Sequence, residues 1–287
     1  MKKSARLRQL INQPEVLVAP GAYDGITARL VEQAGFSTVY MTGAGTSMAH
    51  GFPDFGLLSM SEMVDNAAMM ARTVEIPVIS DADTGYGNEL NVTRTVREFE
   101  ARGVAGIHIE DQVAPKRCGH LDGKEIIPRN EFISKIRAAV AARRDPDFVI
   151  IARTDSRAVA GFDEAIERAN AAMAAAADVA FVEAVQSAEE LALVPKRVNG
   201  PCLLNVVPGG KTPRVNMHEA QALGYRLAIL PALLLNAVMA AGDQALRVLK
   251  ETGVPSGGAK EISVVDTFRR FGADEWNALR QRFATQD

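Results

Sequence analysis

The sequence of 287 residues has only two cysteines, Cys118 and Cys202, and they lie far apart in the chain. So little cysteine fits a reducing compartment better than a disulfide framework. A surplus of basic charge is also missing, because the formal net charge is −3. A chain without a basic surplus gives no reason to expect nucleic acid as a partner.

The sequence also lacks a hydrophobic run long enough to cross a membrane. Its most apolar stretch, residues 227–242, contains Pro231 and Asn236 and is shorter than the ~20 residues that a membrane helix needs. The basic residues near the start are followed by polar residues 12–14 instead of the apolar core of a signal peptide. With 47% hydrophobic and 23% charged residues, the composition is that of a soluble globular protein. We expect it in the cytoplasm and away from membranes.

Two common site motifs are absent. No Gly-x-x-x-x-Gly-Lys-Ser/Thr loop is present, and the segment "GGKTP" at 209–213 lacks that spacing, so nucleotide chemistry has no support. No Cys-x-x-Cys or His-x-x-x-His pair is present, which argues against zinc.

What the chain does contain is a series of eight short apolar runs separated by longer helical patterns. Hydrophobicity that is continuous rather than alternating is typical of strands covered on both faces, as in a parallel sheet. The segments between them, such as residues 60–72, 91–102, 131–143 and 162–177, are long enough for crossover helices. The runs span residues 16–21, 37–45, 77–85, 105–112, 148–155, 178–184, 201–210 and 226–231.

Eight repeats of strand and helix predict an α/β fold, a (β/α)₈ TIM barrel, whose usual size is about 250 residues. A doubly wound open sheet is the alternative. We expect the barrel over residues 1–250 and a C-terminal helical extension over residues 251–287, with a glycine-rich break at Ser256-Gly257-Gly258. The segment "DEWNALRQRF" at 274–283 has helical spacing and could pack on another subunit or on its own barrel.

Polar residues stand at the carboxyl ends of the predicted strands. In a barrel these ends form the mouth that holds the active site, because the loops there converge on the axis. Six strands contribute such residues: Thr42 to Gly45, Asp81 with Asp83, Glu110 with Asp111, Arg153, Glu183 and Asn205.

Asp81 and Asp83 are two residues apart, so in an extended strand both would point to the same side. Two such carboxylates repel one another unless a cation or proton lies between them, and hard oxygen ligands suit Mg²⁺ or Mn²⁺. Glu110 and Asp54 could complete the metal shell. The alternative is that these acids cap the helices that follow.

Arg153 and the segment "TGAG" at 42–45 are candidate anion-binding groups. A guanidinium at a rigid strand end can pair with a substrate carboxylate, and its alternative is an internal salt bridge to Glu183 or Asp155. The glycine-rich segment offers backbone N–H groups without bulky side chains, although it could equally be a simple turn. His108, inside a predicted strand, is expected to be a core residue.

Cys118 lies in "PKRCGH", between two cations and a glycine. Neighbouring Lys116 and Arg117 would favour the thiolate, so reactivity competes with the ordinary interpretation of a buried structural thiol. His120 shares this loop.

Taken together, the segments "APGAYDGITARL", "PDFG", "DADTGYGN", "GIHIEDQ", "PKRCGH", "IARTD" and "GGKTP" resemble the isocitrate lyase and phosphoenolpyruvate mutase superfamily. The resemblance covers most of the chain in order and is closest to the short lyases: methylisocitrate lyase, 2,3-dimethylmalate lyase and the oxaloacetate hydrolase group. It implies a Mg²⁺-dependent carbon–carbon lyase, with a small carboxylate as substrate and a homotetramer with exchanged C-terminal helices as its assembly.

The resemblance also assigns roles by position. Asp81 would bind the metal, and Asp83, Glu110 and Asp54 would hold its waters. The substrate would contact the backbone of Thr42, Gly43 and Ala44 together with Arg153, Gly119 and His120, and Glu183 and Asn205 would line the far end of the pocket. Cys118 would be the general acid that protonates the enolate carbon, on a mobile loop spanning residues 113–125. Arg153 and Glu183 complete the expected catalytic group.

Two positions depart from the family pattern. Asn236 stands where methylisocitrate enzymes carry an arginine for an extra carboxylate, and Pro208 replaces a glutamate found in several lyase branches. Loss of that cation beside leucines 233–235 favours a 2-alkylmalate, with methylisocitrate cleavage and oxaloacetate hydrolysis as alternatives. A phosphonate mutase or hydrolase is a further alternative, although that branch typically lacks the cysteine. The last alternative function is that of a binding module, a barrel without catalytic activity.

Overall fold

The computed structural model describes residues 1–255 and 262–284. Its eight strands form a closed parallel barrel in which each strand pairs with the next and β1 pairs with β8. Closure excludes the open doubly wound sheet. Each predicted apolar run holds one strand, except that β1 extends one residue beyond its run. The strands are β1 Leu17–Ala22, β2 Val39–Met41, β3 Val78–Asp81, β4 Gly106–Glu110, β5 Val149–Thr154, β6 Val179–Val182, β7 Cys202–Asn205 and β8 Leu227–Leu230.

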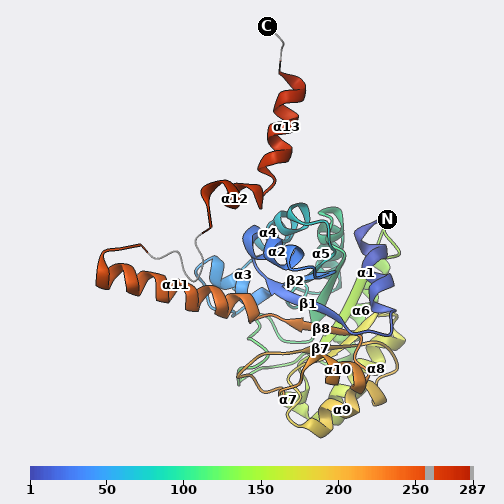
Figure 1. Cartoon of the computed structure of the whole chain (residues 1–287). Helices are drawn as coiled ribbons and strands as arrows, with labels where there is room; N and C mark the ends of the chain where they lie inside the picture. The colour runs from blue at the N-terminus through green and yellow to red at the C-terminus, as the bar shows by residue number, and fades with distance from the viewer. Residues whose placement is uncertain (256–261, 285–287) are drawn as a thin grey trace. The chain divides into compact units, whose positions relative to one another are not determined.

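Helices surround the strands (Figure 1). The predicted helices are all present, with ends that differ by a few residues. The helix α5, for example, begins two residues earlier than predicted, where Asn88 caps it and forms a capping box with Asn91. The helices are α1 Lys3–Ile11, α2 Gly25–Gln33, α3 Gly43–Ala49, α4 Met60–Thr73, α5 Glu89–Ala101, α6 Arg129–Ala142, α7 Arg157–Ala160, α8 Phe162–Ala174, α9 Ala188–Arg197, α10 Met217–Leu223, α11 Leu233–Thr252, α12 Val264–Arg269 and α13 Ala273–Phe283.

One hydrophobic cluster fills the inside of the barrel. It collects alternate residues from the strands, including Tyr40, Ile79, Ile151, Phe181 and Leu203. Since side chains alternate across a strand, the residue two positions further on also points inward, at the level of the mouth. These next residues are Thr42, Asp81, Arg153, Glu183 and Asn205. Because side chains alternate along each strand, these five polar side chains all point into the barrel at its mouth.

The first helix closes the other end of this interior. Leu7 and Ile11 of α1 belong to the same buried cluster as the inward residues of the strands, and Leu7 has no exposed surface. A Cβ atom added to Gly106 at the start of β4 would lie 3.3 Å from the Leu7 side chain. The barrel core is thus packed down to its amino-terminal end, as is usual in this fold.

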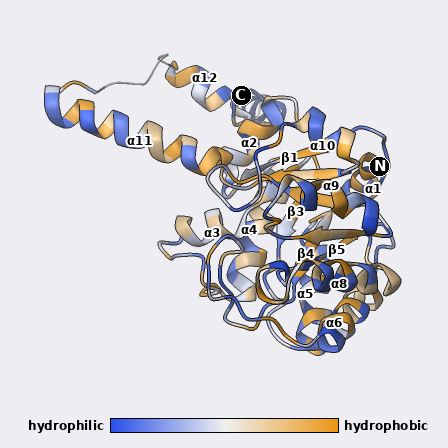
Figure 2. Cartoon of the chain, turned by 90° about the horizontal axis from the view of Figure 1, so that it is seen from below, coloured by the Kyte–Doolittle hydropathy of each residue, from blue (hydrophilic) through white to orange (hydrophobic). Residues whose placement is uncertain are grey.

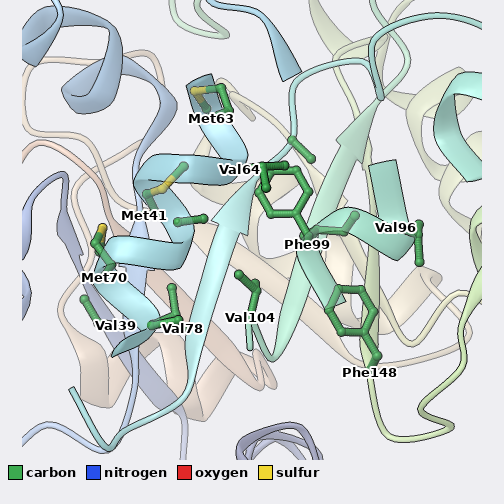
Figure 3. Close-up of a cluster of buried hydrophobic side chains, with 14 of the residues drawn as sticks. Val39, Met41, Met63, Val64, Met70, Val78, Val96, Phe99, Val104 and Phe148 are labelled. Atoms are coloured by element: carbon green, nitrogen blue, oxygen red, sulfur yellow. The ribbon is translucent and has the colours of Figure 1, made fainter. Parts of the chain in front are cut away.

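A second cluster lies between the strands and the surrounding helices. Outward-facing Val39, Met41 and Val78 pack against Met63, Val64 and Met70 of α4 and against Val96 and Phe99 of α5, with Val104 and Phe148 nearby (Figure 3). Figure 2 shows orange, hydrophobic residues along strands such as β1 and β5 and blue, hydrophilic residues on outer helices such as α6. Burial on both faces explains why the strands read as continuous apolar runs.

The chain divides into two compact units, residues 1–235 and 236–287. The first holds the barrel. The second holds most of α11 together with α12 and α13, and α13 coincides with the helix predicted at 274–283. The predicted break at Ser256-Gly257-Gly258 lies outside the described residues, and the division predicted at residue 250 stays a prediction. Within the described residues, no helix has the length and apolar character that crossing a membrane requires.

Barrel closure gives a testable prediction at Gly21 in β1. A Cβ atom there would stand 2.5 Å from the carbonyl oxygen and 2.6 Å from the Cα of Pro231, directly after β8. Because backbone atoms cannot rotate aside as a side chain can, Gly21→Ala is expected to lower the free energy of unfolding by about 1–3 kcal/mol, the usual cost of overpacking. Calorimetric melting would show this as a lower Tm.

Gly242 in α11 provides the matched control, because nothing lies within 4 Å of its added Cβ. Alanine is the better helix former by ~1 kcal/mol, so Gly242→Ala should hold or raise the Tm. A Gly21→Ala protein that melts like the wild type would contradict the tight β1–β8 closure.

Candidate active site

The structure brings the predicted residues of six strand ends together at the barrel mouth. Glu110 and Arg153 are register partners on β4 and β5, and Arg153 is the partner of Phe181, two residues before Glu183. The loop of residues 113–125 covers them, since its Lys116, Gly119 and Lys124 all contact mouth residues. The six inward residues are all buried: Thr42, Asp81, Glu110, Arg153, Glu183 and Asn205.

Asp81 is fixed from three sides at the end of β3. Its Oδ1 accepts a hydrogen bond from the backbone N–H of Asp83 at 2.9 Å, and its Oδ2 lies 3.4 Å from the Tyr40 hydroxyl. Gly43 presses against the carboxylate, because an added Cβ would overlap Oδ2. Glycine at position 43 therefore makes room for Asp81, the candidate metal ligand. The sequence alone indicates only that this segment offers backbone N–H groups to an anion.

His108 is the register partner of Asp81 on the neighbouring strand β4 and is fully buried, as predicted for a core residue. Its Nε2 is 2.8 Å from the Tyr40 hydroxyl and 3.6 Å from Oδ1 of Asp81. Burial lowers the pKa of His108 to about 4, so the ring is neutral at pH 7. We assign the proton to Nε2, which donates to Tyr40 while Tyr40 donates to Asp81, because the buried Nδ1 then remains an acceptor and no N–H is left unpaired.

The chain leaves the extended conformation at Asp83, which has a φ of +45°. The expectation that Asp81 and Asp83 project from one extended strand is therefore wrong, because β3 already ends at Asp81. The alternative capping role is also excluded for the following helix, since Asn88 caps α5. A non-glycine residue with positive φ is strained, and such strain persists only where surrounding contacts hold it.

Lys116 supplies the contact that holds Asp83. Its Nζ lies 2.5 Å from Oδ1 of Asp54 and 3.0 Å from Oδ1 of Asp83, and all three groups are buried. Burial would lower the pKa of Lys116, but Asp83 and Asp54 raise it well above the ordinary value. Burial also raises the pKa of Asp83 to about 6, helped by Asp81 and Asp54 and opposed by Lys116.

The predicted metal acids are thus close together, but a lysine ammonium joins two of them. Among the described residues, no group of three His, Cys, Asp or Glu side chains is arranged to hold a metal ion. The carboxylate of Glu110 is buried without full compensation. Neither of its oxygens accepts a hydrogen bond, although Oε2 lies 3.2 Å from Nε of Arg153. Burial raises the pKa of Glu110 well above the ordinary value. Unsatisfied buried carboxylate oxygen beside Asp81 and Asp83 fits a hard divalent cation.

Arg153 is held by three acids. Nε and Nη2 donate to the two oxygens of Asp155 at 2.8 and 3.2 Å, and Nη2 lies 3.4 Å from Oε2 of Glu183. Glu110 is the third. The guanidinium carbon stands 5.2 Å from the centre of the Phe181 ring. The predicted salt bridges to Glu183 and Asp155 are both present, and Nη1 makes no hydrogen bond with any described residue, so one face remains for a ligand.

Thr42 to Ala44 form the start of α3. The Thr42 side chain caps this helix by accepting from the backbone N–H of Gly45 at 3.4 Å. The N–H groups of Gly43 and Ala44 make no hydrogen bond with described residues, as expected in the first turn of a helix. The segment is therefore a helix start with two available donors rather than a bare glycine turn.

Glu183, Asn205 and His120 form one connected group at the far side of the mouth. Glu183 accepts from the backbone N–H of Ala184 at 2.7 Å and from Nδ2 of Asn205 at 3.0 Å. His120 accepts at Nδ1 from the backbone N–H of Lys211 at 3.1 Å, so its other nitrogen, 3.5 Å from Glu183, carries the proton. Burial lowers the pKa of His120, which keeps the ring neutral. Oδ1 of Asn205 is buried without a partner and is open to a hydrogen-bond donor.

Cys118 is partly exposed, and burial raises the pKa of its thiol. The interpretation that Lys116 and Arg117 favour a thiolate is wrong, because neither cation acts on the sulfur. Lys116 is committed to Asp54 and Asp83, and Arg117 lies over the Phe55 ring, 5.8 Å from its centre. The protonated form predominates, which suits a proton donor rather than a nucleophile.

Several residues of the site escaped sequence reasoning. Tyr40 gave no local signal, because it sits in an apolar run and reaches Asp81 only through the pairing of β2 with β3. Lys124 lies in a loop, where side-chain direction cannot be read from spacing. Asp155 was noticed only as a salt-bridge alternative. Asn236, one of the two departures from the family pattern, is exposed, and Leu234 packs against the outer hydrophobic cluster.

A barrel whose mouth buries so many acids and cations under one loop defines an enzyme site for a small anionic ligand. The sequence profile described as phosphoenolpyruvate phosphomutase matches residues 7–250. The chain therefore belongs to the PEP mutase/isocitrate lyase superfamily, as the resemblance predicted.

Within the superfamily, the chain is similar to lyases, as two relatives show. A 2,3-dimethylmalate lyase of Eubacterium barkeri is 48% identical over 232 residues, which cover 80% of this chain and 80% of that protein. A 2-methylisocitrate lyase of Aeropyrum pernix is 44% identical over 247 residues, covering 86% of this chain and 80% of that protein.

Solved structures extend the similarity to nearly the whole length. An oxaloacetate acetylhydrolase bound to 3,3-difluorooxalacetate superposes with a TM-score of 0.94 at 40% identity, covering 98% of this chain and 97% of the other. A phosphonopyruvate hydrolase in complex with oxalate and Mg²⁺ has a TM-score of 0.89 at 31% identity, with 99% of each chain covered.

The state of Cys118 can be measured by alkylation. Iodoacetamide reacts with the thiolate, so its rate against pH reports the thiol pKa. We expect the apparent pKa of Cys118 in the folded protein to lie above that of the hexapeptide Pro-Lys-Arg-Cys-Gly-His, which has the same neighbouring cations but no burial. Peptide mapping separates Cys118 from the buried Cys202. A folded-state pKa below that of the peptide would contradict the assignment of the protonated thiol.

Proposed function

We propose that the protein is a Mg²⁺-dependent carbon–carbon lyase that cleaves a 2-alkylmalate-type dicarboxylate to a 2-oxo acid and a carboxylate, with Cys118 as general acid. The observation that carries the proposal is the position of the loop. Gly119 packs so closely against Arg153 and Glu183 that an added Cβ would overlap both side chains. Its neighbour Cys118, protonated at neutral pH, therefore stands over the anion-binding groups.

Asp81 is the proposed direct metal ligand, with Asp83, Glu110 and Asp54 holding waters around the ion. The unsatisfied oxygens of Glu110 and the excess of carboxylate over cation at the mouth support this assignment. When bound, Mg²⁺ supplies positive charge that stabilises oxyanions developing on the substrate. Mn²⁺ presents similar ligand chemistry and is expected to substitute.

The residues of this chain then divide the remaining tasks. The free N–H groups of Gly43 and Ala44 and the open face of Arg153 bind a substrate carboxylate. Breaking the bond between C2 and C3 turns the 2-hydroxyl into a 2-oxo group and leaves an electron pair on the carbon beside the second carboxylate. Cys118 gives that carbon its proton, and the resulting thiolate regains a proton when the one released from the hydroxyl returns to it, so the net reaction consumes no proton.

The far side of the mouth favours a substrate with few charges. Glu183, Asn205 and neutral His120 offer hydrogen bonds there and contribute no cation of their own. A third substrate carboxylate would meet Glu183 without compensation, and like charges in a buried site repel strongly. An alkyl-bearing malate therefore fits better than methylisocitrate. Similarity to a dimethylmalate lyase and to an oxaloacetate acetylhydrolase supports the same class of small dicarboxylate.

A substrate panel tests the proposed reaction. With Mg²⁺ present, we expect kcat/KM to be highest for 2,3-dimethylmalate or another 2-alkylmalate, with oxaloacetate and methylisocitrate lower by about tenfold or more, as one or two lost contacts would give. Release of the 2-oxo acid is measured by reductive coupling, and phosphonopyruvate is followed by phosphorus NMR. EDTA should abolish turnover, and excess Mg²⁺ should restore it. Turnover that persists without metal, or that is fastest on a phosphonate, would overturn the proposal.

Replacing the proton donor tests its role separately. Cys118→Ser should lower kcat by about 100-fold to 10,000-fold, the range for loss of a general acid. Calorimetric titration with oxalate and Mg²⁺ serves as the control and should give an affinity similar to that of the wild type, because the thiol is not a proposed ligand. If kcat is unchanged while oxalate still binds, Cys118 is not the donor.

We also propose that four subunits assemble through residues 251–287 by exchanging helices. The second unit exposes large apolar side chains on α12 and α13, among them Phe268 at 63%, Trp276 at 71% and Phe283 at 74% exposure. Such surface marks an interaction site. Trp276→Asp combined with Phe283→Asp should shift the mass measured by light scattering from four subunits to fewer. A monomeric wild type would contradict the assembly.

A further inference from the structure

Lys124 is a second buried lysine on the loop of residues 113–125, and the proposed chemistry does not use it. Its side chain is only 1% exposed. The ammonium donates to the carbonyl oxygen of Gly119 at 2.6 Å and to Oδ1 of Asp155 at 2.8 Å. One contact lies within the loop and the other on the barrel wall, so this cation joins the two.

Asp155 passes the contact on to Arg153. The oxygen that accepts from Lys124 also accepts from Nη2 of Arg153, and the other oxygen accepts from Nε. The backbone of Asp155 is itself held, because its N–H donates to Oδ1 of Asp111 at 2.8 Å, and Oδ2 of Asp111 accepts from Arg168 at 3.0 Å. Asp155 thus links the ammonium of Lys124 to the guanidinium of Arg153 through a carboxylate that is itself held in place.

The Gly119 carbonyl is the contact nearest to the proton donor. Gly119 follows Cys118 directly and packs against Arg153 and Glu183. Fixing its carbonyl fixes the Gly119–His120 peptide plane, one residue beyond Cys118. The loop turns back immediately afterwards, where the N–H of Leu121 donates to the carbonyl of Cys118 at 2.9 Å.

We propose that Lys124 is a positioning residue that sets Cys118 and Arg153 in place together: when the loop lies over the mouth, its ammonium ties the Gly119 carbonyl to Asp155. The importance of Lys124 for turnover rests on the proposed function, whereas its hold on the loop does not. Lys116 acts at the other end of the loop, on the metal acids, and cannot replace this contact.

Lys211 provides a matched comparison. It also bridges this loop, with Nζ 2.5 Å from Oδ1 of Asp122, but its side chain is 28% exposed and that of Asp122 is 95% exposed. Exposed pairs of this kind contribute little, whereas removing one partner of a buried pair leaves an uncompensated charge. Two lysines with similar short contacts to the same loop are therefore expected to differ sharply on substitution.

Lys124→Met, Lys124→Arg and Lys211→Met test the proposal in the full-length protein by two measurements. Iodoacetamide alkylation of Cys118 reports how well the loop is held, and it requires neither substrate nor metal. We expect Lys124→Met to be alkylated about tenfold faster than the wild type, Lys124→Arg to be intermediate and Lys211→Met to change less than twofold. In turnover, Lys124→Met should lower kcat by about 100-fold with a smaller change in KM, because the reacting groups are misplaced while the metal acids remain.

The two proposals fail in different ways. If no carboxylate is turned over but Lys124→Met still accelerates alkylation, the proposed function falls and the positioning role stands. If Lys124→Met reacts with iodoacetamide and substrate as the wild type does, or if Lys211→Met matches it, the positioning role is overturned. Should Lys124→Met not fold, Lys124→Gln decides, since its amide can still donate to Gly119 but no longer neutralises Asp155.

Discussion

The constraint on which this structure depends is the compensation of charge buried at one end of a barrel. Three cations, Lys116, Lys124 and Arg153, stand there out of water and face six carboxylates: Asp54, Asp81, Asp83, Glu110, Asp155 and Glu183. Each cation touches at least two acids or an acid and a carbonyl, so every one acts as a cross-link. The cations do not match the acids in number, and the deficit appears where burial raises the pKa of Asp83 and Glu110. A site in this state attracts further positive charge.

The fold provides this arrangement at little local cost. Apart from His108 on β4, the inward positions below the acids are apolar, so the acids rest on a packed floor that includes Tyr40, Ile79 and Phe181. Two of the cations come from a loop rather than from the strands. The acids are consequently preorganised by the barrel, while their neutralisation depends on a segment that has no regular structure of its own.

The strands and the wall of the site could be predicted because both follow from local patterns: continuous apolar runs, and polar residues placed where those runs end. What could not be predicted depends on contacts between distant segments. No spacing indicates that Lys116 reaches Asp54, that His108 supports Asp81 through Tyr40, or that Asp83 adopts a left-handed conformation. The surroundings of Cys118 could not be predicted for the same reason, since Lys116 and Arg117, its neighbours in sequence, bind elsewhere in space.

The packing of Leu7 and Ile11 beneath the barrel determines how small molecules reach the site. With the lower end filled by side chains, molecules exchange with the interior only through the mouth that residues 113–125 cover. Substrate and products therefore use the same opening of the barrel, and any product formed inside passes the loop of residues 113–125 as it leaves.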